Sequence, residues 1–151
     1  MLFIERTIQH TLAYLHFLLA LFTLGSNPQA LNVEVVAPVT GGEPFVAVYA
    51  SPEGFRPEEE LVSTQHALHP AAATAEIDLP LPARGEYVVA GFQDLNGNGK
   101  LDKNFFGVPT EPYGFARVPP SKWRAPSFGE VATPVANGDR VTIELRHWDA
   151  Y

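Results

Sequence analysis

The sequence of 151 residues contains no cysteine. Disulfide bonds, thiolate metal sites and cysteine nucleophiles are therefore excluded together. A domain of about 120 residues buries enough apolar surface to be stable without such cross-links. The absence of cysteine is thus compatible with export to an oxidising compartment, because a secreted domain of this size does not require disulfides.

Basic residues are also scarce, with ten Lys and Arg against 17 Asp and Glu and a formal net charge of −7 at pH 7. They are scattered, and no cluster of Lys or Arg occurs along the chain. Binding to nucleic acids or to an anionic membrane surface depends on such clusters, so we expect neither partner. Hydrophobic residues make up 46% of the chain, which excludes a disordered acidic tail.

One apolar run spans residues 12–24, and a Gly-Ser-Asn-Pro sequence ends it. As a helix it would be about 20 Å long, which is too short for a hydrocarbon core of about 30 Å. Its length and all-round apolar character are typical of signal peptides, although Glu5 offsets Arg6 and no cleavage site stands out. We therefore predict that residues 1–30 are a signal peptide, cleaved near residues 25–30. The alternatives are a buried amphipathic helix and an uncleaved anchor.

Fourteen Pro and 12 Gly divide the rest of the chain into short segments. Several of these alternate between apolar and polar residues, which is the period of a β-strand. Asn137-Gly138 is a hairpin turn signal, so the last two strands are expected to pair. Residues 51–60 are rich in Pro and Glu and predict a surface loop. We expect strands at residues 31–35, 45–49, 75–79, 86–92, 130–135 and 141–145.

These segments predict that residues 31–151 form one all-β domain. Short strands separated by turns favour an antiparallel two-layer β-sandwich over a fold with crossover helices. The side chains expected to point into its core are those of Tyr87, Val89, Ile143, Val33 and Val35.

The segment from Phe105 to Phe128 is long and irregular, and it carries many aromatic residues. Loops of this length are usually either functional or disordered. The aromatic residues predict an ordered loop that packs on the sandwich. They are Phe105, Phe106, Tyr113, Phe115, Trp123 and Phe128.

The clearest functional motif is Asp94-Leu95-Asn96-Gly97-Asn98-Gly99-Lys100-Leu101-Asp102. Side chains with oxygen atoms occupy positions 1, 3, 5 and 9 of this stretch and Gly occupies position 6, as in the first part of an EF-hand calcium loop. A hard cation needs six or more oxygen ligands about 2.4 Å away, and a short segment that wraps around it supplies them. We therefore predict a calcium site whose ligands are the side chains of Asp94, Asn96, Asn98 and Asp102 and the carbonyl of Lys100.

Two departures from an EF-hand make such a site weak. Position 12 is Phe105 instead of a bidentate Glu, and only two carboxylates bring charge. We expect a dissociation constant of about 0.1–1 mM unless another carboxylate, such as that of Glu111, folds back onto the loop. The alternative is a turn without metal, because Asn96-Gly97 and Asn98-Gly99 are both strong turn signals.

The sequence favours a non-enzymatic module, and it predicts no catalytic residue and no organic cofactor. The enzymatic alternative is a hydrolase of a cell-envelope polymer. Its acid and base, or the ligands of a metal-bound water, would be the carboxylates of Asp94, Asp102 and Glu111. Against this alternative, the carboxylates lie among strong turn signals and no nucleophile motif accompanies them.

A further alternative is a carbohydrate-binding module that uses Tyr113, Phe115 and Trp123 as stacking rings. A coplanar row of exposed rings would favour it, and buried rings would remove it. In either non-enzymatic reading the mature protein is periplasmic or secreted and is not stably inserted in a membrane. Its partner would be an envelope polysaccharide or another protein.

A longer stretch resembles a known family. Residues 91–102 (Gly-Phe-Gln-Asp-Leu-Asn-Gly-Asn-Gly-Lys-Leu-Asp), residues 106–115 (Phe-Gly-Val-Pro-Thr-Glu-Pro-Tyr-Gly-Phe) and residues 125–128 (Ala-Pro-Ser-Phe) resemble a bacterial domain of unknown function found in exported proteins. The resemblance covers essentially the whole mature chain. It implies an exported β-sandwich protein, loosely similar to transthyretin-like or immunoglobulin-like modules, and it implies no particular activity. Members usually carry Ser or Asn after the Tyr-Gly-Phe, where this chain has Ala116-Arg117, so the resemblance implies no binding role for these two.

Overall fold

A computed structural model describes residues 29–56, 62–65 and 73–151. The predicted signal peptide therefore lies outside the described residues, apart from positions 29 and 30. Within the described part of the chain, no helix is both long and apolar enough to span a bilayer.

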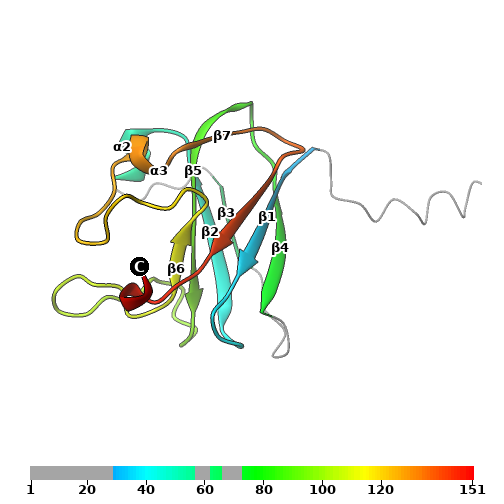
Figure 1. Ribbon diagram of the computed structural model, residues 1–151. Helices are drawn as coiled ribbons and strands as arrows, with labels where there is room; N and C mark the ends of the chain where they lie inside the picture. Colours follow the sequence, from blue (N-terminus) through cyan, green and yellow to red (C-terminus); the bar gives the residue numbers. More distant parts are fainter. Residues whose placement is uncertain (1–28, 57–61, 66–72) are drawn as a thin grey trace, which may run out of the picture.

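The described residues form two β-sheets with a few short helices, so the prediction of an all-β fold is confirmed. The strands of the first sheet lie in the order β4 (Thr74–Leu79), β1 (Leu31–Val36) and β8 (Arg140–Glu144). The strands of the second lie in the order β3 (Val62–Gln65), β2 (Glu43–Tyr49), β5 (Gly85–Asp94) and β6 (Tyr113–Phe115), with β7 (Thr133–Val135) paired to the start of β5. Figure 1 shows the two sheets facing each other, with the C-terminus and the long loops on its left-hand side.

Most strand pairs are antiparallel, as predicted, but β1 and β8 run parallel. The predicted hairpin between residues 130–135 and 141–145 is therefore wrong. The turn at Asn137-Gly138 does form, but it carries the chain from β7 in one sheet to β8 in the other. The Asn137 side chain holds this crossing in place, because it bonds both the N–H (2.8 Å) and the carbonyl (2.9 Å) of Leu81.

Two short helices occupy segments that were predicted as loop and strand. Helix α2 (Pro52–Phe55) begins after Ser51, whose hydroxyl accepts a hydrogen bond from the Gly54 N–H at 3.1 Å. Helix α3 (Phe128–Val131) replaces the first two residues of the strand predicted at residues 130–135. A Ser followed three residues later by Glu marks its start, which is a helix signal that the alternation of apolar residues concealed.

The core lies between the sheets, and it contains all five side chains predicted to point inward. Val33 and Val35 come from β1, Ile143 comes from β8, and Tyr87 and Val89 come from β5. Because successive side chains of a strand point to opposite faces, Val88 of β5 lies on the other side of its sheet. It belongs to a second buried cluster, with Tyr49, Val131 and Ala132, against which Phe55, Phe115 and Phe128 pack.

The aromatic segment between residues 105 and 128 departs from the prediction in part. Phe115, which belongs to β6, and Phe128 pack on the second cluster. Phe105, Phe106 and Trp123 do not, and they are 96%, 84% and 78% exposed. Phe105 and Phe106 contact each other edge to face at a centroid distance of 5.5 Å.

Candidate functional site

The predicted calcium loop begins where β5 ends, and the Asp94 side chain organises it. This carboxylate is 1% exposed. Its Oδ1 atom accepts hydrogen bonds from the N–H groups of Gly97 at 2.7 Å and of Asn96 and Asn98 at 3.3 Å each. Its Oδ2 atom accepts one from the N–H of Gly99 at 2.6 Å. The backbone therefore wraps around a buried anionic group.

This wrapping explains both the glycines and the charge state of Asp94. Gly97 and Gly99 have φ angles of +75°, in the left-handed region that other residues rarely adopt. Burial on its own would raise the pKa of Asp94. The hydrogen bonds from the N–H groups of Gly99, Gly97, Asn98 and Asn96 outweigh burial and hold this pKa below its usual value. The carboxylate is therefore ionised at neutral pH.

Three of the other predicted ligands converge beside this carboxylate. The Asn96 side-chain amide donates to Asp102 Oδ2 at 2.6 Å, and the Asn98 amide lies 3.0 Å from both Asp102 oxygens. The amide oxygens accept backbone N–H groups two residues further on, from Asn98 at 3.1 Å and from Lys100 at 2.9 Å. The side chains of Asn96, Asn98 and Asp102 are thus brought together around the loop that Asp94 organises.

Glu111 folds back onto the loop, but it bonds the backbone. Its side chain is almost fully buried. Its Oε1 atom accepts the Leu95 N–H at 2.8 Å, and its Oε2 atom accepts the Asp102 N–H at 3.1 Å. Glu111 therefore joins the start of the loop to its end. The sequence singled out this residue as the carboxylate that could complete the site. In the structure it instead holds the two ends of the loop together through their backbone N–H groups.

The loop retains oxygen lone pairs for a cation. A carboxylate offers about four lone-pair sites and an amide oxygen two. Asp94 Oδ2 accepts one N–H, and so does each amide oxygen of Asn96 and Asn98. One lone pair therefore remains on each of these three atoms. To bind a cation, the two amides must turn their nitrogens away from Asp102, which opposes binding.

Among the residues that the structure describes, no three His, Cys, Asp or Glu side chains gather as a metal cluster. The predicted site does not require such a cluster, because Asn side chains and a carbonyl supply most of its ligands.

The same geometry bears on the acid–base chemistry that the hydrolase alternative needs. Two of the three carboxylates of the hydrolase alternative, Asp94 and Glu111, are buried and bonded to backbone N–H groups. A lowered pKa also makes Asp94 a poor proton donor near neutral pH.

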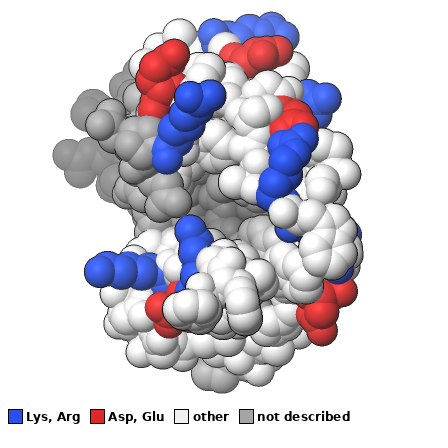
Figure 2. All heavy atoms as spheres, turned by 90° about the vertical axis from the view of Figure 1, so that its left-hand side faces the viewer, with Lys and Arg blue, Asp and Glu red and all other residues white. Residues whose placement is uncertain are grey.

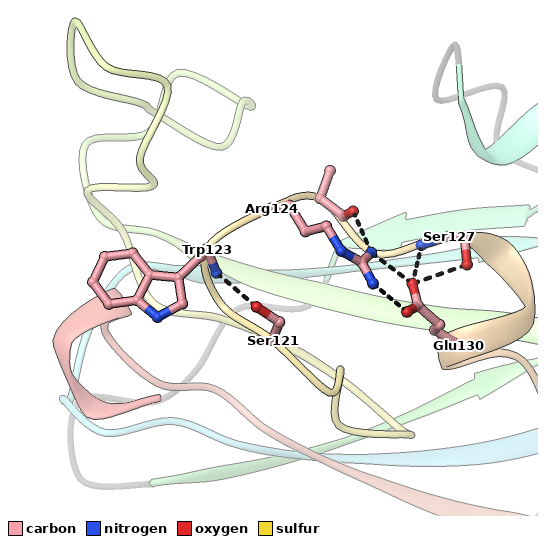
Figure 3. Close-up of polar contacts among 6 residues, drawn as sticks. Ser121, Trp123, Arg124, Ser127 and Glu130 are labelled. Carbon is pink, nitrogen blue, oxygen red and sulfur yellow. Dashed lines mark hydrogen bonds and ion pairs between the residues drawn. The ribbon is translucent and has the colours of Figure 1, made fainter.

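A second candidate surrounds Trp123, in the loop between β6 and α3. The backbone N–H of Trp123 donates to the Ser121 hydroxyl at 3.2 Å. Next to it, Arg124 Nη1 donates to Glu130 Oε2 at 2.8 Å, and the same Glu130 oxygen accepts the N–H of Ser127 at 2.8 Å. These bonds tie the loop to the start of α3. Figure 3 shows the Trp123 indole turned away from this network.

The chain terminus supplies the other side of this second candidate. Trp148 begins a 3₁₀ turn, η1 (Trp148–Ala150), and its ring meets the Trp123 ring edge to face at a centroid distance of 5.2 Å. The Lys122 ammonium lies 4.6 Å from the centre of the Trp148 ring and 5.6 Å from that of Trp123. A shallow cavity of about 310 Å³ opens beside them. It is lined by Val118, Pro119, Pro120, Ser121, Lys122, Trp123, Arg146 and Tyr151.

Sequence reasoning found only part of this second candidate. Of the three rings proposed for sugar stacking, only Trp123 is exposed, while Tyr113 and Phe115 are half-buried and perpendicular to each other at 90°. No coplanar row is formed by these rings. Arg146 and Tyr151 were missed, because only the fold brings the last residues of the chain beside residues 118–123. The one local feature of the sequence that pointed to this place was a Trp next to a Lys in a Pro-rich stretch.

The family of the chain follows from its sequence. A model of a family of uncharacterized proteins conserved in bacteria (DUF2141) matches residues 33–144, which is well over half of the chain, and the chain belongs to this family. No curated protein and no solved structure matches the chain significantly.

Proposed function

We propose that this protein is an exported, non-enzymatic binding module whose Asp94–Asp102 loop holds a calcium ion weakly. Export is inferred from the apolar run of residues 12–24. The proposal includes the sandwich type expected from the sequence, immunoglobulin-like or transthyretin-like. The periplasm and the extracellular space contain enough calcium for a weak site to be of use.

The observation that carries the proposal is the convergence of Asn96, Asn98 and Asp102 beside the ionised carboxylate of Asp94. In this arrangement calcium would replace the amide hydrogens that now face Asp102, and the two carboxylates would balance its charge. The Lys100 carbonyl is the fifth expected ligand. Water would complete the shell of six or more oxygens. The rearrangement of two amides supports a dissociation constant at the weak end of about 0.1–1 mM.

A thermal melt in calcium and in chelator tests the proposal. At a tenfold excess of calcium over its dissociation constant, mass action stabilises the folded state by about 1.4 kcal/mol. For a domain of about 120 residues this raises the melting temperature by roughly 4–8 °C. Magnesium at the same concentration controls for ionic strength, because its preference for shorter, octahedral coordination does not suit this loop.

The matched variants are Asp102→Asn and Asp149→Asn, which remove the same charge at two exposed or half-exposed positions. Asp102→Asn should abolish the calcium shift while changing stability in chelator by less than about 1 kcal/mol. Asp149→Asn should keep the shift. The alternative of a turn without metal predicts no calcium shift in any of the three proteins, and that result would overturn the proposal.

A further inference from the structure

The cavity beside Trp123 has features that the calcium loop does not explain. A large ring that is 78% exposed makes little contribution to the core. Its backbone N–H donates to the Ser121 hydroxyl, the neighbouring Arg124 pairs with Glu130 (Figure 3), and its ring meets the Trp148 ring edge to face. An exposed aromatic ring that its neighbours already orient loses less conformational freedom when a ligand stacks on it, and such rings are effective anchors.

The charge of the cavity is opposite to that of the protein. Two of its lining residues, Lys122 and Arg146, are cationic, and within the described residues no Asp or Glu lines it. The chain as a whole carries a net charge of −7. Figure 2 faces the left-hand side of Figure 1, and it shows several Lys and Arg side chains on this face, some of them beside Asp or Glu. The local charge therefore favours an anionic ligand over a neutral or cationic one.

Both cations retain donors that a ligand can use. Arg146 bonds the Glu144 carboxylate through Nη2, and a guanidinium has five N–H donors in all. Its carbon atom lies 6.0 Å from the centre of the Tyr151 ring, so the side chain is held at the edge of the cavity. The Lys122 ammonium makes one long hydrogen bond of 3.5 Å, to the Trp148 carbonyl. It has two further N–H donors.

The size and shape narrow the class of ligand. A volume of about 310 Å³ is at the lower limit of small-molecule sites, which span about 300–1,000 Å³. A single ring with its substituents fits such a space. The cavity is shallow, so the ligand keeps one side in solvent. A pyranose meets these conditions, because it has an apolar C–H face for the indole and a polar rim for water.

We propose that this cavity binds a carboxylated sugar unit of an anionic polysaccharide, with the pyranose ring on Trp123 and the carboxylate at Arg146 and Lys122. This site is separate from the calcium loop and does not depend on the function proposed for that loop. The carbohydrate-binding alternative drawn from the sequence used Trp123 together with Tyr113 and Phe115, and it named neither Lys122 nor Arg146. In the present proposal one ring and two cations form the site.

The test is a titration of the full protein with trigalacturonate, followed by tryptophan fluorescence and by calorimetry in the presence of chelator. Saturable binding is expected in the range of about 0.1–1 mM, and it should weaken as salt is raised because part of it is electrostatic. The methyl ester of the same trisaccharide, which keeps the rings and removes the charge, should bind at least about tenfold more weakly.

Three variants assign the binding to the cavity. Trp123→Ala should weaken binding by about tenfold or more, because it removes the anchor ring. Lys122→Gln should weaken binding of the acid while leaving that of the ester unchanged. Phe106→Ala is the matched control, since it removes an exposed ring from a different loop and should have no effect. Thermal melts show whether each variant is folded.

Several results would overturn the proposal. They are the absence of saturable binding at 10 mM sugar, equal binding of acid and ester, and unchanged binding by Trp123→Ala. Binding of an acidic peptide in place of the sugar would also overturn it. Loss of the calcium shift described above would leave this site unaffected, so the two proposals fail independently.

Discussion

The substitution Asp94→Ala tests whether one buried carboxylate organises the candidate calcium loop. It removes the acceptor of four backbone N–H groups, two at short distances of 2.6 and 2.7 Å and two at 3.3 Å. A hydrogen bond to a charged group contributes about 1.5–3 kcal/mol to stability. Counting only the two short bonds at the lower value gives about 3 kcal/mol. Water can reach part of the exposed loop in the variant, so we expect a loss of about 2–3 kcal/mol.

The assay is equilibrium urea unfolding at pH 7 in chelator, with Asp102→Ala as the matched control. The Asp102 carboxylate accepts hydrogen bonds from two side-chain amides at the surface, so its removal should cost less than about 1 kcal/mol. The pKa of Asp94 is lower in the folded state than its usual value. Its contribution is therefore present above that usual value and is lost as pH falls through the folded pKa. A cost for Asp94→Ala no larger than that for Asp102→Ala would refute this account of the loop.

Two further predictions concern the loop near Trp123 and the contact between β6 and β8. Arg124, and after it Ser127, lowers the pKa of Glu130 from 4.5 to about 2, so stability from this pair is present above pH 4.5 and is lost as pH falls toward 2. In Glu130→Gln the melting temperature should fall less steeply as the pH is lowered through this window than it does in the unchanged protein. The same pH dependence in both proteins would contradict the assignment. Gly114→Ala would place a Cβ atom 2.5 Å from the Glu144 carbonyl oxygen, and we expect it to cost about 2 kcal/mol or more in urea unfolding. Gly129→Ala, in α3, is its control, because the new Cβ atom meets nothing within 4 Å. This substitution should be neutral or should stabilise the protein by about 0.5 kcal/mol. Equal costs at both sites would contradict the packing argument.

Local periodicity was sufficient to predict much of the fold. The alternation in β1 and β5 correctly predicted that Val33, Val35, Tyr87 and Val89 point inward, because period-two burial is a property of each strand on its own. The predicted pairing of β8 with the strand before it was wrong, because β8 pairs with β1, which is more than 100 residues earlier in the sequence. The turn signal at Asn137 does not decide the partner, since it is compatible both with a hairpin and with a crossing between sheets.

The candidate sites show the same division between local and distant information. The spacing of Asp94, Asn96, Asn98 and Asp102 predicted a wrapped loop, because these residues bond their own backbone within a few positions. From the sequence, Glu111 could be named only as a carboxylate able to complete the site if it folded back; its bonds to the loop backbone could not be predicted. The cavity beside Trp123 needed Arg146 and Tyr151 from the chain terminus, and no local pattern indicates that they lie together.

The most direct test of the proposed calcium site is a calcium titration followed by the backbone amide signals of the protein in NMR. The N–H groups of Gly97 and Gly99 point at the Asp94 carboxylate, so they report directly on a cation that binds there. We predict saturable shifts, with a midpoint of about 0.1–1 mM, confined to residues 94–102 and the segment around Glu111. Signals of Gly97 and Gly99 that remain unchanged up to 10 mM calcium would contradict the account and assign the loop to turn formation alone.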